Sequence, residues 1–436
     1  MRRQLSRKDE MKSYRSYILV IASVVIFLSC NSKQNKPHNQ TYNSIGLELD
    51  SLHLELEAIK EKTIIPGFSV AVIHDDSTIY RRGFGQSDIL NNNNFTPETI
   101  HTIASISKTF IGVSIMKLVE LGKLNLDDPI NEILPFKIYS PHYPGTPITV
   151  RHLVTHTSSL NDDFDDGEKR PSQLIESSIY AKNEIPQSLA QTIYYYDGVK
   201  LELEDFMKEA FTPDGKWYAE SNFSQFRPGD KYEYSNEGSN LAALIVEVIA
   251  GVPFHQFTRE NIFEPLQMNN TSWFYGSLDS TFSKVYVLEN VDLVSELYEF
   301  PRHSESNYPC GDLKSSMIDL TKYLAEIGRG YNGEGTILNS ESYKTLLSPQ
   351  LGREKFEDID EGPLNDEYNV GVFWAISKPG LVLHKGGSIG VYSILYFDPE
   401  NNMGAIAYCN LAHQDFGKIV SVIRKYQTKM ALKLKQ

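Results

Sequence analysis

The pattern of hydrophobic and polar positions predicts a sheet assembled from both ends of the chain. Across residues 47–62, apolar side chains recur at three- and four-residue spacing, which is typical of an amphipathic helix. The stretch "FSVAVIHDDSTIYRRGFG" then predicts two strands, Phe68–Ile73 and Thr78–Arg82, around a polar turn. Near the other end, residues 381–387, 391–399 and 403–410 also have strand character, and residues 415–432 form a last amphipathic helix.

The middle of the chain, about residues 135–275, is helical in character. Its clearest helices are predicted within residues 203–211 and 239–263, with prolines and glycines between the pieces. The order of helix, strands, helical insert, strands and helix predicts a mixed α/β fold of the α+β type. We expect an antiparallel sheet flanked by the N- and C-terminal helices, with an all-helical lobe inserted. A cleft between the lobe and the sheet is the natural place for a ligand.

Composition narrows the class of function. The chain has 436 residues, of which 41% are hydrophobic and 22% charged, as in a globular protein with a sizeable core. Its formal net charge of −14 argues against nucleic acid as a partner, since such binding needs a basic surface. His, Cys, Asp and Glu show no metal-ligand spacing, so we expect neither a metal site nor a cofactor.

The N-terminus predicts export. Basic residues precede an apolar run, Tyr17–Leu28, which is shorter than the ~20 residues that span a bilayer. The following "IFLSC" resembles a bacterial lipobox, in which Cys30 is lipidated, although Phe27 stands where leucine is usual. We therefore expect a lipoprotein signal peptide over residues 1–30, a flexible tether over 31–46 and a hydrolytic domain over 47–430. An uncleaved anchor or a plain signal peptide is the alternative, and each version places the body in the cell envelope.

Two of the three cysteines lie in the body of the chain. Cys310 and Cys409 are expected to be separate buried thiols, and a disulfide between them is left open.

The most chemically suggestive stretch is "HTIASISKTFIGVSIMKLVELGKLNLDDP". Ser105 and Lys108 are three residues apart, so on a helix they share a face, whereas Ser107 points elsewhere. The positive potential of a helix N-terminus favours ionisation of a hydroxyl, and burial lowers the pKa of a lysine, so that Lys108 can serve as a base. Taken alone, the pattern is weak, and Ser105 is better explained as an ordinary helix cap.

Two further stretches turn the interpretation toward catalysis. "FRPGDKYEYSNEGSNLAALIVEVIAG" places Tyr234-Ser235-Asn236 just before a helix, and "VLHKGGSIGVYSILYFDP" places His384-Lys385-Gly386-Gly387 at a strand end. With these motifs in this order, the sequence resembles the serine β-lactamase and penicillin-binding-protein superfamily, in its class C-like, D-peptidase and esterase branch. The resemblance extends over nearly all of residues 63–410.

The resemblance implies a role for each motif residue. Ser105 would be the acylated nucleophile, Lys108 its neighbouring base or proton relay, and Tyr234 the phenol that exchanges protons with Lys108 and the leaving group. Asn236 would hydrogen-bond the acyl-side amide of the substrate. His384 to Gly386 would line the cleft, and the backbone N–H groups of Ser105 and Gly387 would form the oxyanion hole.

The sequence also departs from the family pattern. The third motif is not lysine-Thr/Ser-glycine, so either His384 or Lys385 faces the cleft. We favour His384, because this register aligns Gly390 with the glycine that follows the motif in the family. A histidine carries less positive charge than lysine and weakens the case for a substrate held by its carboxylate. Ser159 and Asp312 each replace a usual glycine. The stretch Asn161–Phe226 either roofs part of the cleft or is a surface insertion.

The sequence thus predicts an exported, lipid-anchored serine hydrolase that forms an acyl-enzyme on Ser105. Its expected substrates are amides or esters, with peptidoglycan-derived D-peptides foremost. A β-lactamase proper and a binding protein without turnover, such as a wall-fragment or β-lactam sensor, remain the alternatives.

Overall fold

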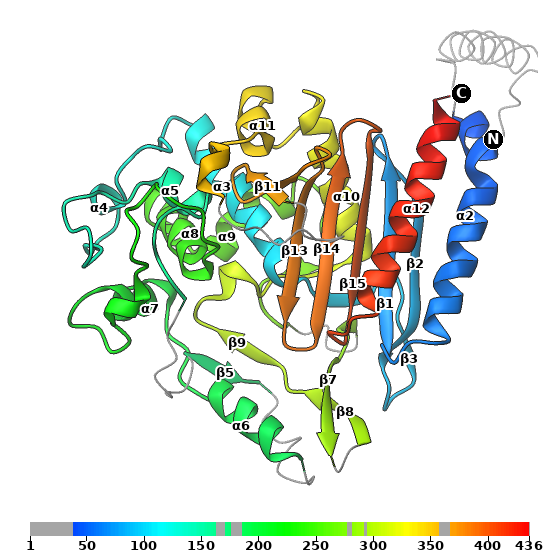
Figure 1. The fold of residues 1–436 in the computed structure, drawn as a ribbon, viewed down its shortest axis with the longest axis horizontal. Coiled ribbons are helices and arrows are strands. Elements are labelled where there is room, and N and C mark those ends of the chain that lie inside the picture. The colour runs from blue at the N-terminus through cyan, green and yellow to red at the C-terminus, as the bar shows by residue number, and fades with distance from the viewer. Residues whose placement is uncertain are drawn as a thin grey trace, which may run out of the picture.

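A central eight-stranded antiparallel sheet forms the middle of the fold (Figure 1). The structure is a computed structural model, which describes residues 38–162, 171–175, 185–276, 281–291, 294–356 and 367–435. The strand order is β11-β12-β13-β14-β15-β1-β2-β3. The strands are β1 (Gly67–His74), β2 (Ser77–Asp88), β3 (Asn93–Asn94), β11 (Glu367–Val370), β12 (Ala375–Ser377), β13 (Val382–Ser388), β14 (Val391–Asp398) and β15 (Met403–Cys409). Because β15 pairs with β1 antiparallel, the two chain ends join in one sheet, and the predicted fold class is confirmed.

One face of the sheet is covered by the two terminal helices. Helices α2 (His38–Lys60) and α12 (Phe416–Leu434) pack side by side on it (Figure 1). Alternate strand residues such as Val70, Ala405 and Ile394 point to this side and bury against Leu52 and Ile423. Helix α2 begins at His38, inside the segment predicted to be a tether, so the described fold starts earlier than residue 47. The predicted signal peptide lies outside the described residues.

The other face packs against the helical lobe and forms the largest core. This layer contains α3 (Ser107–Glu120), α4 (Ile130–Ile133), α5 (Val150–Val154), α7 (Leu203–Phe211), α8 (Asn236–Ala250), α9 (Phe254–Thr258), α10 (Met317–Tyr331) and α11 (Ser340–Leu347). Helix α6 (Gln187–Tyr196) packs in a separate, smaller cluster with Leu174 and Phe300. Helix α3 lies at the centre, and Phe110 of this helix stacks on Tyr323 of α10 at 4.0 Å between ring centroids. A helix that is apolar on all sides is expected only where it runs through a core, as α3 does.

Short strands surround the lobe, and the sequence did not predict them. They are β4 (Ile100–Thr102), β10 (Lys314–Ser316) and β6 (Thr271–Ser272) in one sheet, β5 (Ser172–Leu174) with β9 (His303–Glu305), and the hairpin of β7 (Val285–Val291) and β8 (Val294–Phe300). Single helical turns complete the described fold: η1 (Ala104–Ile106), η3 (Glu220–Asn222), η4 (Arg259–Phe263), η6 (Tyr308–Cys310) and η7 (Arg353–Lys355). The predicted all-helical lobe is therefore helical with small strand additions.

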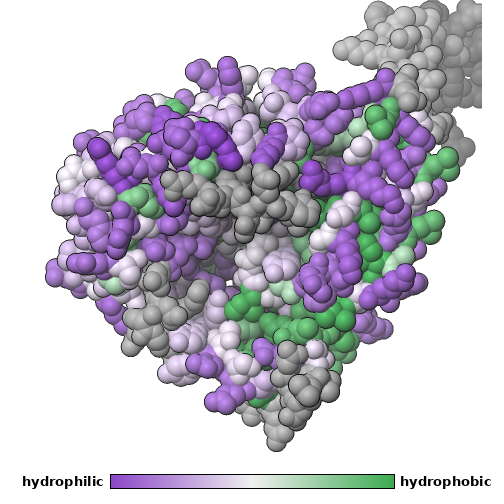
Figure 2. All heavy atoms as spheres, viewed as in Figure 1, coloured by the Kyte–Doolittle hydropathy of each residue, from purple (hydrophilic) through white to green (hydrophobic). Residues whose placement is uncertain are grey.

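The face drawn in Figure 2 is mainly hydrophilic, and hydrophobic residues gather in the lower half of this view. Within the described part of the chain, no single helix has the length and hydropathy of a membrane span; the bent pair Asn236–Ala250 and Phe254–Phe263 meets that test only jointly. Cys310 and Cys409 are both free thiols, as expected.

Ser159 occupies a backbone position that suits glycine. Its φ of 59° lies in the left-handed region, which costs an L-residue about 1–2 kcal/mol. The residue is only 2% exposed, and its Oγ has no hydrogen-bond partner among the described residues. An unpaired buried hydroxyl costs a further 1–3 kcal/mol or so, by typical values.

We therefore expect Ser159→Gly to raise the free energy of unfolding by about 1–2 kcal/mol in urea titrations. Ser159→Ala should raise it less, because alanine removes the unpaired hydroxyl but keeps the left-handed strain. A glycine variant no more stable than the alanine variant would show that backbone strain at this position is negligible.

Candidate active site

Ser105 lies on a strained turn in front of α3. It is the middle residue of η1, and Ala104 before it has a φ of 47°, a left-handed value that is unusual for alanine. The Ile103 carbonyl accepts a hydrogen bond from the Ser393 hydroxyl of β14 at 2.7 Å, which ties the turn to the sheet. Ser105 is thus not a helix cap: α3 starts at Ser107, and Ile106 in the cap position makes no side-chain capping bond.

Lys108 is completely buried and joins three segments of the chain. Its Nζ donates to Ser105 Oγ at 3.2 Å, to Asn236 Oδ1 at 2.7 Å and to the Cys310 carbonyl at 2.7 Å. Three donated bonds use all three hydrogens of an ammonium group. The sequence-predicted pair of Ser105 and Lys108 is therefore in hydrogen-bond contact, and Asn236 belongs to the same cluster.

The protonation state of Lys108 differs from the sequence-based expectation. Burial lowers its pKa, as predicted, but the electrostatic interactions with the ionisable groups of Tyr234 and Cys310 raise it, and the net pKa lies above the ordinary value. The expected depressed pKa is wrong, because the reasoning from sequence counted burial and omitted the ionisable groups around Nζ. In the resting structure Lys108 is an ammonium that donates to Ser105 Oγ.

Tyr234 lies over this cluster at the mouth of the site. Its ring centroid is 5.0 Å from Lys108 Nζ, and 41% of the residue is exposed. The His156 ring stacks on it at 4.5 Å, and His156 Nδ1 accepts from the backbone N–H of Ser235 at 3.2 Å. Burial and the neighbouring Lys108 charge hold the pKa of His156 well below its usual range, so this ring is neutral. His156 is thus a positioning residue for Tyr234.

Strand β13 forms the opposite wall. Val382 belongs to the lobe-side core and Leu383 to the core beneath α12, so the alternation places His384 on the lobe side and Lys385 on the other. The His384 ring lies 6.3 Å from the Tyr234 ring, and burial lowers the pKa of His384 to about 3. The histidine register favoured from sequence agrees with this arrangement.

Gly386 and Gly387 differ in the space around their Cα atoms. A Cβ on Gly386 would meet Ser393 Oγ at 2.2 Å and the Ile103 carbonyl at 2.6 Å, whereas a Cβ on Gly387 would come no nearer than 3.7 Å to Tyr392. Gly386 therefore lets the strand approach the Ser105 turn, and Gly387 leaves its backbone open beside Ser105. Gly387 and Ser105 line the same cavities, as the predicted oxyanion hole requires.

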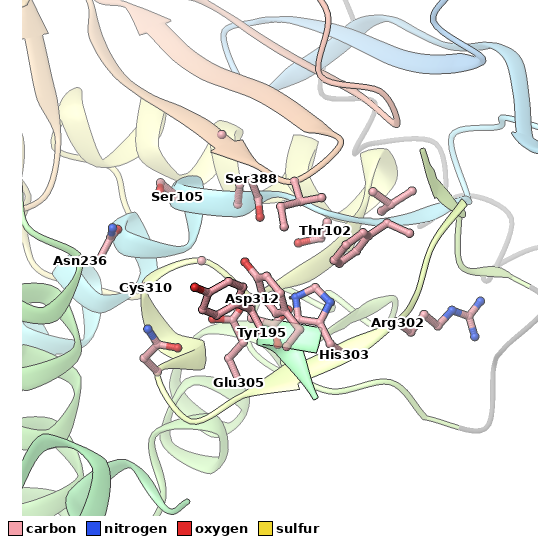
Figure 3. A pocket seen from close by; sticks show the side chains of 18 of the residues that line it. Thr102, Ser105, Tyr195, Asn236, Arg302, His303, Glu305, Cys310, Asp312 and Ser388 are labelled. Carbon is pink, nitrogen blue, oxygen red and sulfur yellow. Dashed lines mark hydrogen bonds and ion pairs between the residues drawn. The ribbon is translucent and has the colours of Figure 1, made fainter. Parts of the chain in front are cut away.

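Two cavities meet at Ser105, and we call them the charged arm and the neutral arm. The charged arm, of about 640 Å³, is lined by Cys310, Asp312, His303 and Arg302 among others (Figure 3). The neutral arm, of about 750 Å³, is lined by Tyr234, His384, Tyr392 and Phe416 among others. Tyr195, Tyr196, Phe206 and Trp217 also line the charged arm, so the described part of the 161–226 stretch does border the cleft.

The structure adds Asp162, which sequence reasoning did not single out. Its Oδ2 accepts from the Asn236 N–H at 2.8 Å, and its Oδ1 accepts from the Glu237 N–H and the Ser235 hydroxyl, both at 3.0 Å. A carboxylate at these N–H groups satisfies the first turn of α8 and complements its dipole. No sequence feature sets it apart from the other acidic residues of this stretch.

The fold and the Ser-Lys-Tyr cluster define a serine hydrolase of the β-lactamase and penicillin-binding-protein type. The chain matches the family described as Beta-lactamase over residues 56–426 and belongs to that family, which confirms the resemblance seen in the sequence. The matched range covers both the sheet and the lobe.

Similar proteins come from several bacteria. Protein flp of Staphylococcus aureus (strain MW2) is 23% identical over 362 residues, which are 83% of this chain and 62% of flp, so this chain spans less than two thirds of that relative. A beta-lactamase/D-alanine carboxypeptidase from Yersinia pestis superposes with a TM-score of 0.64 at 18% identity, over 88% of this chain and 98% of that one. The D-amino acid amidase from Ochrobactrum anthropi SV3 gives 0.58 at 21% identity, over 90% and 99%. At these identities the structural likenesses show the fold.

Asp162 yields a testable prediction. Asp162→Asn replaces a carboxylate by an amide, which offers only one neutral acceptor oxygen to the hydroxyl of Ser235 and the N–H groups of Asn236 and Glu237. Because these hydrogen bonds hold the start of α8, the Asn236 side chain should shift relative to Lys108. We expect kcat for Ser105-dependent hydrolysis to fall about ten-fold or more, with a smaller effect on KM and a loss of about 1 kcal/mol in stability.

The matched control is Asp230→Asn, which changes an exposed carboxylate of the loop that leads to Tyr234. This variant should retain wild-type rates. An Asp162→Asn enzyme that a phosphonate acylates as fast as wild type would exclude a positioning role for Asp162.

Proposed function

We propose that this protein is an exported serine hydrolase that cleaves amide or ester bonds through an acyl-enzyme on Ser105. Peptidoglycan-derived D-peptides and related small D-amino acid derivatives are the leading substrate class. The observation that carries the proposal is the buried Lys108 ammonium, which contacts Ser105 Oγ and Asn236 Oδ1 at the junction of two cavities. The names of the amidase and carboxypeptidase neighbours support the same class of substrate.

The geometry supports a two-step reaction. Since Lys108 already holds its protons, the base is the phenolate form of Tyr234, which the Lys108 ammonium stabilises; it takes the Ser105 proton and becomes a phenol. The Ser105 oxygen attacks the substrate carbonyl, and the oxyanion is held by the N–H groups of Ser105 and Gly387, each donor contributing about 3 kcal/mol. Tyr234 then protonates the departing amine or alcohol, and water hydrolyses the acyl-enzyme in a second cycle of the Lys108–Tyr234 pair.

A specific acyl-enzyme can be detected directly. We expect a fluorophosphonate to add one equivalent to the protein at Ser105, seen by mass spectrometry of the peptide, and Ser105→Ala to remove both the adduct and hydrolysis of D-alanine esters and amides. Tyr234→Phe should slow acylation about 10²–10³-fold, because it removes the proton-exchanging oxygen but keeps the ring on His156.

The outcomes also separate the alternatives. Rapid nitrocefin turnover would indicate a β-lactamase, and a persistent penicillin adduct without turnover would indicate a sensor. No adduct at all, with Ser105→Ala indistinguishable from wild type in ligand binding, would contradict the proposal and favour a non-covalent binding protein.

Export and anchoring belong to the same proposal and rest on the sequence of residues 1–30. We expect the chain made in a bacterial host with lipoprotein processing to fractionate with membranes and to carry diacylglycerol on Cys30. Cys30→Ser should abolish lipid labelling, while Cys310→Ser should leave it unchanged. A Cys30→Ser chain that still incorporates labelled fatty acid would refute lipidation at this residue.

A further inference from the structure

The two arms differ in their charge, and this difference bears on the substrate. Ser105, Asn236 and Gly387 line both arms, so a substrate whose carbonyl lies at Ser105 extends into each. Tyr234 lines the neutral arm and is absent from the lining of the charged arm among the described residues. Under the proposed function, the group that Tyr234 protonates therefore leaves through the neutral arm.

The charged arm contains ion pairs in its wall. Lys314 Nζ lies 2.5 Å from Asp312 Oδ1, and His303 Nε2 lies 3.1 Å from Glu305 Oε1. In Figure 3, Asp312 and His303 lie along the arm beyond Cys310, and Arg302 lies at the end away from Ser105. Paired charges of both signs offer donors and acceptors to a polar acyl portion.

The neutral arm has a different wall. The Tyr392 ring, 41% exposed, lies 6.1 Å from the Phe416 ring, and Ile394 and Val420 continue this apolar surface. His384 and His156 are neutral, because burial lowers the pKa of both rings. Among the described lining residues, Lys385 is the one with a permanent charge, and its side of β13 is opposite to that of His384.

A leaving group with a free carboxylate would lose water in this arm without a new ionic partner, because the Lys108 ammonium beneath Tyr234 already donates its three hydrogens to Ser105, Asn236 and Cys310. An aryl or alkyl group would instead exchange water for favourable contact with Tyr392 and Phe416.

We propose that the neutral arm selects an uncharged, apolar leaving group, so that the enzyme prefers aryl and alkyl esters or arylamides over substrates whose leaving group carries a carboxylate. This inference rests on the proposed function and narrows it: D-amino acid esters and amides fit the groove better than peptides that end in a free D-alanine.

The test compares two esters that share one acyl group. The phenyl and 3-carboxyphenyl esters of N-acetyl-D-alanine differ by one carboxylate on the leaving group. After correction for their hydroxide-catalysed rates, we expect kcat/KM of the full-length enzyme to favour the phenyl ester about ten-fold or more. Tyr392→Arg should shift this ratio at least about ten-fold toward the carboxyphenyl ester, because it places a cation in the neutral arm.

The matched control is Tyr139→Arg, which changes an exposed tyrosine that lines neither arm and should leave the ratio unchanged. A wild-type enzyme that hydrolyses the carboxyphenyl ester as well as the phenyl ester, or a ratio that Tyr392→Arg does not move, overturns this inference alone. Absence of all ester hydrolysis and of a Ser105 adduct overturns the proposed function and this inference with it.

Discussion

The buried ammonium of Lys108 is the constraint on which the site depends. Removing an ammonium from water costs several kcal/mol unless its donors are satisfied, and here every donor has an acceptor. The three acceptors come from the turn before α3, the start of α8 and the turn η6. Any movement of α8 or η6 away from the start of α3 would break one of these bonds at a buried charge, so the charge fixes the relative position of the segments that form the cleft.

Several residues near the active site have a left-handed backbone conformation. Ala104, His156 and Ser159 all have positive φ without being glycine. Such conformations persist only where the surroundings hold them, and they are typical of sites that need a side chain in an unusual direction. Ala104 turns Ser105 out of the regular helix and toward the groove. His156 places its ring beneath Tyr234 while its Nδ1 accepts from Ser235, so one strained residue fixes both the phenol and the loop behind it.

Periodicity predicted the sheet and the terminal helices well, because these elements bury one face against an extended core. It missed β4 and β6, which are short and pair with β10, a strand distant in sequence. It also missed the β7–β8 hairpin, in which polar residues interrupt the hydrophobic pattern. Motif spacing brought Ser105, Lys108, Tyr234 and Asn236 together. The sequence analysis missed Asp162 and the carbonyl of Cys310. A backbone oxygen has no sequence signature, and one aspartate among many acidic residues has no distinguishing pattern. The direction of the Lys108 pKa shift was also missed, because the electrostatic effects of Tyr234 and Cys310 on the pKa of Lys108, with a smaller one from Asp162, outweigh burial.

The contrast between the two arms follows from the layers that they border. The neutral arm runs over the end of the core between the sheet and α12, where Ile394, Phe416 and Val420 already face one another, so its wall is apolar by construction. The charged arm borders β9 and the loop that leads to β10, where short segments satisfy their polar groups through local ion pairs. A nucleophile held between these two regions meets a polar acyl group on one side and an apolar leaving group on the other. Reversing a substrate in the groove would place charge in the apolar arm, so the same layering that stabilises the fold also sets the direction in which a substrate lies across Ser105.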